Sequence, residues 1–126
     1  MTRILLVTGE SGEFDTFKSG LPEDWDTSLG TFSSAEKALD TVKKEKVDVI
    51  VVGSKLDDET SLGFVKKLMK SNPLVNCAMV SSLPHDEFHE ATEGYGLFMQ
   101  VEESPGLEEG ARMVELLNSI NGLMNS

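Results

Sequence analysis

The sequence predicts an α/β protein built on one parallel β-sheet with helices on both faces. Short apolar runs rich in β-branched residues alternate with segments whose apolar residues recur at helical spacing. Five of each alternate strictly along the chain, and each crossover must return the chain to the same end of the sheet, so the strands run parallel. A length of 126 residues with 39% apolar content suits a single domain with a buried core.

The first two strands and helices are expected in the first third of the chain. An apolar run predicts a strand over residues 3–8, and a helix follows over residues 13–21. Residues 25–32 supply the second strand. The sequence from Ser33 to Glu36, Ser-Ser-Ala-Glu, then predicts a capping box, in which a serine hydroxyl and the glutamate carboxylate bond the first free amides of the second helix.

Three further strand–helix pairs complete the alternation. The third strand is the clearest, because its sequence, Val-Asp-Val-Ile-Val-Val, is almost continuously β-branched, which is typical of a strand covered on both faces. The remaining helices are expected after a polar loop at 54–59, over residues 84–92, and beyond a Ser104-Pro105 cap. The three strands are expected at residues 47–52, 76–81 and 96–101.

This alternation favours a flavodoxin-like doubly wound (βα)5 sandwich with strand order 2-1-3-4-5. In such sheets ligands bind beyond the carboxyl ends of the strands, near the switch between strands 1 and 3. Functional residues are therefore sought where the strands end. The domain is expected to span residues 1–120, with residues 121–126 as a flexible tail or the start of a linker.

Composition excludes several classes of function. The chain has 22 acidic and 11 basic residues and a formal charge of −11, which repels polyanions, so direct nucleic-acid binding is not expected. No run approaches the roughly 20 apolar residues of a membrane span, and no basic leader precedes an apolar stretch, which indicates a cytoplasmic protein. Cys77 is the single cysteine, so an internal disulfide and a multi-thiolate metal site are excluded.

Three segments and the spacing of the strand ends resemble the receiver domains of two-component response regulators, the CheY-like family, over essentially the whole chain. These segments are residues 3–7, 34–39 and 47–52. The resemblance implies an aspartate at the end of strand 3 that accepts a phosphoryl group, with acids after strand 1 that hold Mg²⁺. It also implies a lysine ending strand 5, a Ser/Thr hydroxyl ending strand 4 and an aromatic residue on strand 5 that turns inward.

The pocket that this resemblance implies has lost most of its charged groups. Its acceptor position falls on Gly53, which has no nucleophile. The acidic pair falls on Thr8-Gly9 or on Gly9-Glu10, so at most one carboxylate remains, and the lysine position falls on Val101. The sequence therefore predicts a degenerate receiver, or pseudo-receiver, with no catalytic residue, no bound metal and no cofactor.

Two positions of the switch remain, at Ser81 and Phe98. The predicted function is a phosphorylation-independent protein-interaction module, not an enzyme, in two-component-type signal transduction. An alternative is an atypical response regulator phosphorylated on a displaced aspartate, Asp57 or Asp58, although both lie four or more residues beyond the strand end.

The expected interaction surface is helix 4, strand 5 and helix 5, which the family uses for dimerisation or output. From Pro84 onward the chain has nine acids and one base, Arg112, a net charge of −8. This excess predicts another signalling protein with a basic surface as partner and weaker association at high salt, with a homodimer through the same surface as the alternative. The acidic face comprises Glu90, Glu93, Glu102, Glu103, Glu108 and Glu109.

A small flavin- or nucleotide-binding protein of the same fold is the other alternative. Residues 8–12, Thr-Gly-Glu-Ser-Gly, resemble loosely the phosphate loop of flavodoxins, but their glycines are better explained as turn formers, and Glu10 and Glu13 would repel a phosphate. Only Trp25 and Tyr95 are large polar aromatic residues that suit stacking on an isoalloxazine ring.

His85 and His89 are four residues apart, and with Glu93 their spacing is compatible with zinc. Exposed histidines on an acidic helix are the preferred interpretation, because no cysteine or further histidine lies nearby in the sequence.

Overall fold

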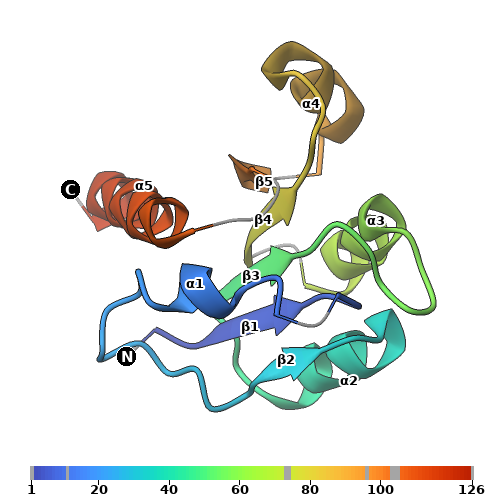
Figure 1. Ribbon diagram of the computed structural model, residues 1–126, viewed down its shortest axis with the longest axis horizontal. Helices are drawn as coiled ribbons and strands as arrows, with labels where there is room; N and C mark the ends of the chain where they lie inside the picture. Colours follow the sequence, from blue (N-terminus) through green and yellow to red (C-terminus); the bar gives the residue numbers. More distant parts are fainter. Residues whose placement is uncertain (1, 11, 73–74, 96, 103–105, 126) are drawn as a thin grey trace.

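The computed structural model describes residues 2–10, 12–72, 75–95, 97–102 and 106–125, with side chains through residue 119. Within these residues, five parallel strands form one sheet in the order β2-β1-β3-β4-β5 (Figure 1). This order and the parallel pairing confirm the predicted fold. The strands are β1 (Ile4–Val7), β2 (Thr31–Phe32), β3 (Val49–Val52), β4 (Asn76–Val80) and β5 (Leu97–Val101).

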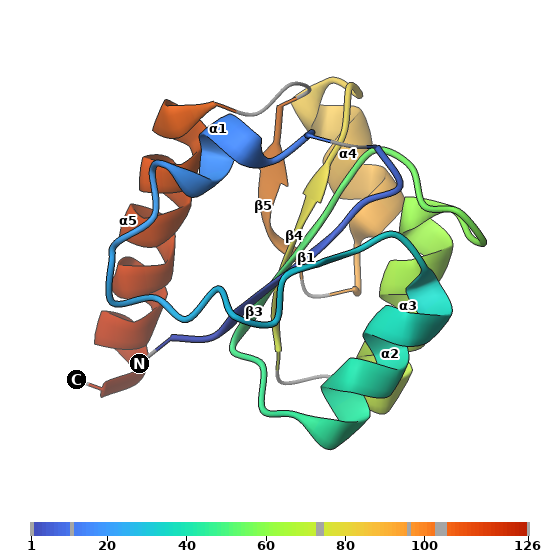
Figure 2. The ribbon, with the colours of Figure 1, turned by 60° about the horizontal axis from the view of Figure 1, so that its bottom comes forward.

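Helices cover both faces of the sheet. Helices α1 and α5 lie on one face, whereas α2, α3 and α4 lie on the other (Figures 1 and 2). Among the described residues, none of the helices is long and apolar enough to cross a membrane. The helices are α1 (Asp15–Lys18), α2 (Ala35–Lys44), α3 (Ser61–Ser71), α4 (His85–Thr92) and α5 (Leu107–Asn125).

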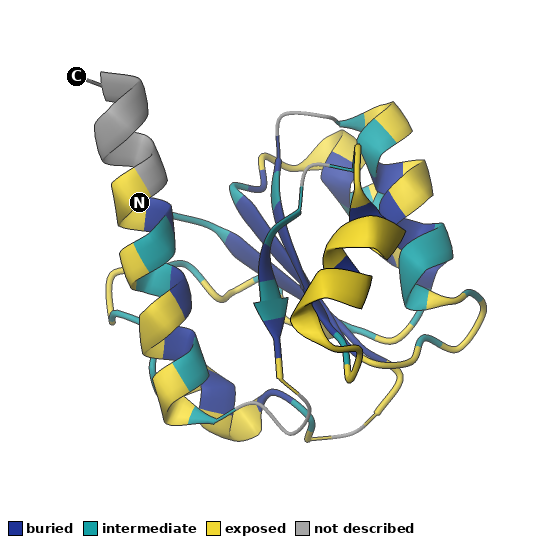
Figure 3. Ribbon diagram, turned by 90° about the horizontal axis from the view of Figure 1, so that it is seen from above, coloured by how far each residue is buried: buried dark blue, intermediate teal, exposed yellow. Residues whose placement is uncertain are grey.

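The central strands are buried on both faces, which explains their unbroken apolar sequences. In β1, Leu5 faces the core beneath α2 and α3, while Leu6 faces the core beneath α1 and α5. Ile50 and Val51 of β3 likewise face opposite cores, and both are fully buried. Figure 3 shows the central strands in dark blue, the colour of buried residues. Each such side chain contributes about 1.5–3 kcal/mol through burial. The strand ends that carry the site are therefore held by the best-packed part of the molecule.

The segment before α2 differs from the prediction. Asp26 makes an isolated bridge with Arg3, and its carboxylate accepts a hydrogen bond from the Ser28 amide at 2.9 Å, which closes a turn. Gly30, with φ of 81°, forms a second turn. These turns replace the strand predicted over residues 25–32, so that β2 is only two residues long.

The first and the last helix also differ from their predicted bounds. Helix α1 has one turn, because the amides of residues 19–21 bond three residues back and tighten the chain into turns instead of continuing the predicted helix over 13–21. At the other end, α5 continues to Asn125, so residues 121–125 are helical. Whether residues 121–126 are a flexible tail or begin a linker stays a prediction. The Ser104-Pro105 cap lies outside the described residues.

Cys77 lies on β4 and is fully buried, and burial raises the pKa of its thiol to about 12. The thiolate, which is the reactive form, is therefore suppressed at pH 8. We expect no alkylation of the folded protein at pH 8 and complete alkylation in denaturing urea, measured by intact mass. Rapid labelling of the folded protein would contradict this buried position.

Candidate functional site

The predicted pocket positions meet at the carboxyl edge of the sheet. The Gly53 amide donates to the Val7 carbonyl at 2.7 Å, and the Ser81 amide donates to the Val101 carbonyl at 3.0 Å. Thr8 follows β1 directly and is only 5% exposed. The sheet therefore brings Thr8, Gly53, Ser81 and Val101 to one edge, as the parallel fold predicts.

Gly53 is buried, and the space where its side chain would project is filled. A Cβ atom on Gly53 would lie 2.5 Å from the Thr8 Oγ1 atom and 2.6 Å from the Thr8 Cβ, and it would also clash with a carboxylate oxygen of Glu13. Real Cβ atoms do not approach other heavy atoms this closely. The glycine at the predicted acceptor position is thus required by its neighbours in this conformation.

Glu13 supplies the carboxylate that fills this space. Its Oε1 atom accepts a hydrogen bond from the Thr8 hydroxyl at 2.5 Å, and its Oε2 atom accepts from the Ser54 hydroxyl at 2.9 Å. The Ser54 amide donates to both oxygens, at 3.3 and 3.4 Å. The carboxylate therefore ties the loop after β1 to the loop after β3, and both of its oxygens have protein partners.

The sequence analysis did not assign this role to Glu13, which it considered only as a charge that repels phosphate. The signal in the sequence was indirect: where the resemblance implies a carboxylate, a glycine leaves a space that some other side chain must fill. The identity of that side chain depends on the conformation of residues 8–13, which the sequence pattern does not determine.

The loop after β3 folds back over the end of β1. The Gly9 amide donates to the Lys55 carbonyl at 2.6 Å, and the Asp57 amide donates to the Ser33 carbonyl at 2.9 Å. The carboxylate of Asp57 approaches Gly9 so closely that a Cβ there would lie 2.8 Å from Oδ1. Glu10 is exposed, and its amide donates to the Thr8 hydroxyl oxygen at 3.0 Å.

Asp58 caps helix α2. Its carboxylate accepts hydrogen bonds from the Ala35 amide at 2.7 Å, the Glu36 amide at 3.3 Å and the Ser34 hydroxyl at 3.1 Å. The N-cap of α2 is Ser34, whose hydroxyl oxygen accepts a hydrogen bond from the Lys37 amide at 3.4 Å, so a serine caps the helix as predicted. The predicted role of the Glu36 carboxylate was wrong, because the carboxylate at the start of the helix is that of Asp58, from the loop after β3. Asp58 is thus engaged in holding a helix end.

The cap makes the stability of the domain depend on pH. The Ala35 amide bond, with those of Glu36 and Ser34, lowers the pKa of Asp58 below its ordinary value of 3.8. A lowered pKa in the folded state contributes stability above pH 3.8 that is lost as the pH falls through the folded pKa. We expect Asp58→Ala to lower the melting temperature at pH 7, with the difference from the parent protein shrinking in acid.

Asp57→Ala is the matched control for the cap, since its exposed carboxylate belongs to the same loop. It should change the melting temperature less than Asp58→Ala does. Equal losses from the two variants, or a loss from Asp58→Ala that persists undiminished in strong acid, would refute the capping role.

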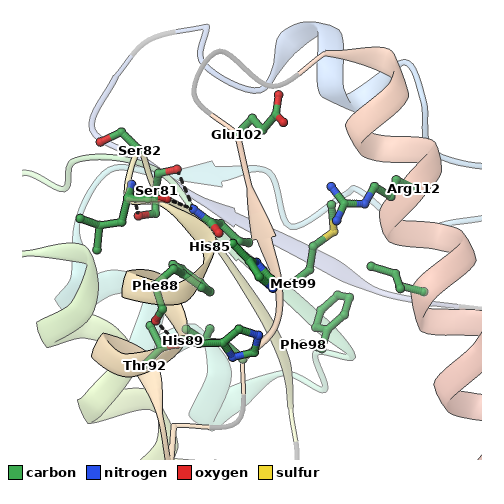
Figure 4. Close-up of a pocket in the computed structure, with 14 residues that line it drawn as sticks. Ser81, Ser82, His85, Phe88, His89, Thr92, Phe98, Met99, Glu102 and Arg112 are labelled. Atoms are coloured by element: carbon green, nitrogen blue, oxygen red, sulfur yellow. Dashed lines mark hydrogen bonds between the residues drawn. The ribbon is translucent and has the colours of Figure 1, made fainter.

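Ser81 and Phe98 occupy the positions of the predicted switch. The Ser81 hydroxyl accepts a hydrogen bond from the Leu83 amide at 3.1 Å, and so it is used within its own loop. The pairing of β4 with β5 shifts register between Cys77 and Ala78, which leaves Phe98 as the extra, bulged residue. Because a bulge re-aims a side chain, Phe98 lies half-buried against the core on the α5 side and lines a groove between α4 and α5 (Figure 4).

The carboxylates of the predicted acidic face differ in exposure and in their contacts. Glu90, Glu93, Glu102 and Glu108 are exposed. Glu109 is engaged: its Oε2 atom accepts from the Glu102 amide at 3.1 Å, and its Oε1 atom lies 3.6 Å from Arg112. Glu103 lies outside the described residues.

Solved structures share this fold. The response regulator domain of CheB from Thermotoga maritima is 22% identical, with a TM-score of 0.74 over 100% of this chain and 98% of that one. A CheY-like receiver domain protein from Methanospirillum hungatei is 19% identical, with a TM-score of 0.73 over 99% and 94%. The chain has the receiver-domain fold. The isolated REC domain of RcsB from Salmonella enterica, solved with the phosphomimetic BeF₃⁻, is 9% identical and reaches a TM-score of 0.79 over 94% and 88%.

Neither a protein-family model nor a curated protein sequence matches the chain. At such low identities, the similarity to receiver domains concerns the fold. The chemistry of the pocket therefore has to be argued from its own residues.

The two aromatic residues considered for flavin stacking lie far from each other. Trp25 packs against the core beneath α1 and α5, whereas Tyr95 packs against the opposite core, with the Lys66 ammonium 5.7 Å from its ring centroid. His85 and His89 contact each other edge to face, with ring centroids 4.6 Å apart. Over the described ranges, no group of three metal-ligating side chains is positioned to hold an ion.

Proposed function

We propose that this chain is a receiver-fold protein-interaction module that works without phosphorylation in two-component-type signalling. The observation that carries the proposal is the Glu13 carboxylate, which fills the space above Gly53 where a phosphoacceptor would project. The position has no nucleophile of its own, and the residue that replaces it is bonded to Thr8 and Ser54.

Electrostatics also oppose phosphoryl chemistry at this pocket. Two unit charges 4 Å apart interact by about 4 kcal/mol at an effective dielectric near 20. An incoming phosphoryl group would meet the charge of Glu13, whereas the lysine position is occupied by Val101, which is apolar and fully buried. The repulsion from Glu13 and the missing lysine charge would both weaken binding of a phosphoryl donor and destabilise a phosphorylated product.

Intact mass spectrometry tests this proposal. The protein is incubated with acetyl phosphate and Mg²⁺ beside a phosphorylatable receiver domain as a positive control. We expect the control to gain one phosphoryl group and this chain to gain none. A stoichiometric gain by this chain would overturn the proposal.

Asp57 is the second candidate for phosphorylation, because its exposed carboxylate lies close to the Gly9 backbone, whereas that of Asp58 is committed to α2. If the mass experiment shows a phosphoryl gain, Asp57→Asn should abolish it. A gain that survives this substitution would exclude the displaced-acceptor alternative at Asp57.

A receiver fold that does not transfer a phosphoryl group can still bind another protein through its surface. We propose that the exposed acids on α4 and α5 bind a basic signalling protein and that the chain is not an enzyme. For an identified partner, reversing Glu90, Glu93 and Glu108 to lysine should weaken binding, and the parent complex should weaken as salt rises. Unchanged affinity in both comparisons would contradict the acidic-face proposal.

A further inference from the structure

A groove of about 650 Å³ lies between α4 and α5, over the edge strand β5 (Figure 4). Its buried floor includes Phe88 and Met99, each 4% exposed. Leu97, Phe98 and Leu116 reach solvent in part and line it as well. The volume is within the range of roughly 300–1,000 Å³ that is typical of ligand pockets.

The end of the groove near the β4–α4 loop is held in place by Gln100. Its side-chain amide donates to the carbonyl oxygens of Ser81 at 3.2 Å and Leu83 at 2.7 Å. Leu83, beside this link, is 41% exposed, which is high for a large apolar residue. Gln100 therefore ties β5 to the β4–α4 loop beside a hollow whose floor is apolar and whose rim is polar.

The polar side chains that line this hollow include one cation, Arg112, and two imidazoles. Arg112 projects from the α5 side, and His85 and His89 line the α4 side (Figure 4). Glu102 is the acid at its rim. A lysine or arginine side chain would meet Arg112 here, so the chemistry of this hollow suits an uncharged apolar side chain.

A second hollow of about 480 Å³ adjoins the first and shares three of its residues, His89, Thr92 and Leu97. It is strongly acidic, because it is lined by Asp86, Glu90 and Glu93, and the described residues of its lining include no lysine or arginine. An apolar hollow and an acidic hollow thus form one continuous surface along α4.

We propose that this surface binds a segment of another protein that inserts a large apolar side chain into the first hollow and places lysine or arginine side chains in the second. The inference rests on the proposed function, since it names the chemistry of the partner of the same face. It goes further because it assigns the apolar side chain of the partner to the first hollow and its basic side chains to the second.

The charge of the face selects against a second copy of this chain. Two copies joined here would bring the acids of one α4 against those of the other, and like charges at an interface oppose association. A basic segment neutralises the same groups. The occupant is therefore a different, basic protein.

Three synthetic peptides of equal length test the assignment. One has tryptophan followed by three lysines, one has alanine followed by three lysines, and one has tryptophan followed by three glutamates. Each is titrated into ¹⁵N-labelled full-length protein, and amide shifts are followed. We expect saturable shifts on α4 and β5 with the first peptide and on the order of tenfold weaker binding of the other two.

Two charge-reversal variants give a matched comparison. The double variant Glu90→Lys/Glu93→Lys alters the acidic hollow, and Glu23→Lys/Asp24→Lys alters two exposed acids between α1 and β2. Each replaces two acids with two bases, so the formal charge changes by four, from −11 to −7. We expect about tenfold weaker binding of the tryptophan–lysine peptide to the first variant and less than twofold for the second.

Equal weakening by both variants would show general charge attraction and overturn the proposal. Equal binding of the glutamate peptide, or shifts that map outside α4 and β5, would also overturn it. So would amide shifts on this face when the protein alone is concentrated, because they would indicate a second copy. A phosphoryl gain in the mass experiment would contradict the proposed function while leaving these peptide results unaffected, which keeps the two failures distinct.

Discussion

Replacing Gly53 with aspartate is expected to destabilise the domain by about 3 kcal/mol instead of restoring a phosphoacceptor, because overpacking a filled site typically costs 1–3 kcal/mol and a like charge adds to this. The new side chain would meet Thr8 and the Glu13 carboxylate, which already occupy its space. Urea unfolding measures the loss. Gly53→Ala separates the steric part from the effect of charge.

A second substitution tests the cause of this loss. Glu13→Ala removes the side chain that fills the space, so Gly53→Asp should cost at least about 1 kcal/mol less in a Glu13→Ala background than in the parent protein. Additive effects of the two substitutions would show that Glu13 and position 53 do not interact, and would contradict the geometry found here.

Gly110→Ala is expected to destabilise the domain by about 2 kcal/mol, although alanine is normally favoured over glycine inside a helix by about 1 kcal/mol. Helices α1 and α5 lie side by side on one face of the sheet (Figure 2), and Gly110 is the residue of α5 that faces Phe17 of α1 and Gly20. A Cβ there would lie 2.5 Å from the Phe17 carbonyl oxygen and 3.3 Å from the Gly20 Cα. These neighbours are backbone atoms, so they cannot yield as a flexible side chain would.

Gly106→Ala provides the control for this contact, because a Cβ at Gly106 would have no neighbour within 4 Å among the residues that the structure describes. It should leave the free energy of unfolding within about 0.5 kcal/mol of the parent value. If Gly110→Ala stabilised the protein instead, the close approach of α1 and α5 would be wrong.

The fold could be predicted because its signals are local. The β-branched run of β3 and the alternation of strands with amphipathic helices were sufficient to predict a parallel sheet and its strand order. Failures came where turns compete with regular structure. Asp26 bonds the Ser28 amide, and Gly30 adopts a positive φ, and together they shorten β2 to two residues.

The sequence predicted where the candidate site lies but only some of the side chains that fill it. Parallel strands end at the same edge of a sheet, so the sequence was sufficient to bring together the residues at the strand ends, which are Thr8, Gly53, Ser81 and Val101. That Glu13 fills the space above Gly53 depends on contacts between two loops, which no spacing in the sequence determines.

The same limit explains why the acid at the start of α2 was misassigned. A serine and a glutamate at the correct spacing gave a plausible capping box, yet Asp58, more than twenty residues away in the sequence, holds the helix end. Long-range polar contacts of this kind depend on how the loops pack, so the local sequence pattern does not predict them.

The most direct test of the central claim is an amide chemical-shift titration of the ¹⁵N-labelled protein with Mg²⁺ and BeF₃⁻, the phosphoryl mimic present in the RcsB structure. If the Glu13 carboxylate occupies the pocket and no acceptor remains, the amides of Thr8, Gly53 and Ser54 should keep their positions throughout the titration. Saturable shifts at these three amides would show that the pocket binds a phosphoryl mimic and would contradict the account.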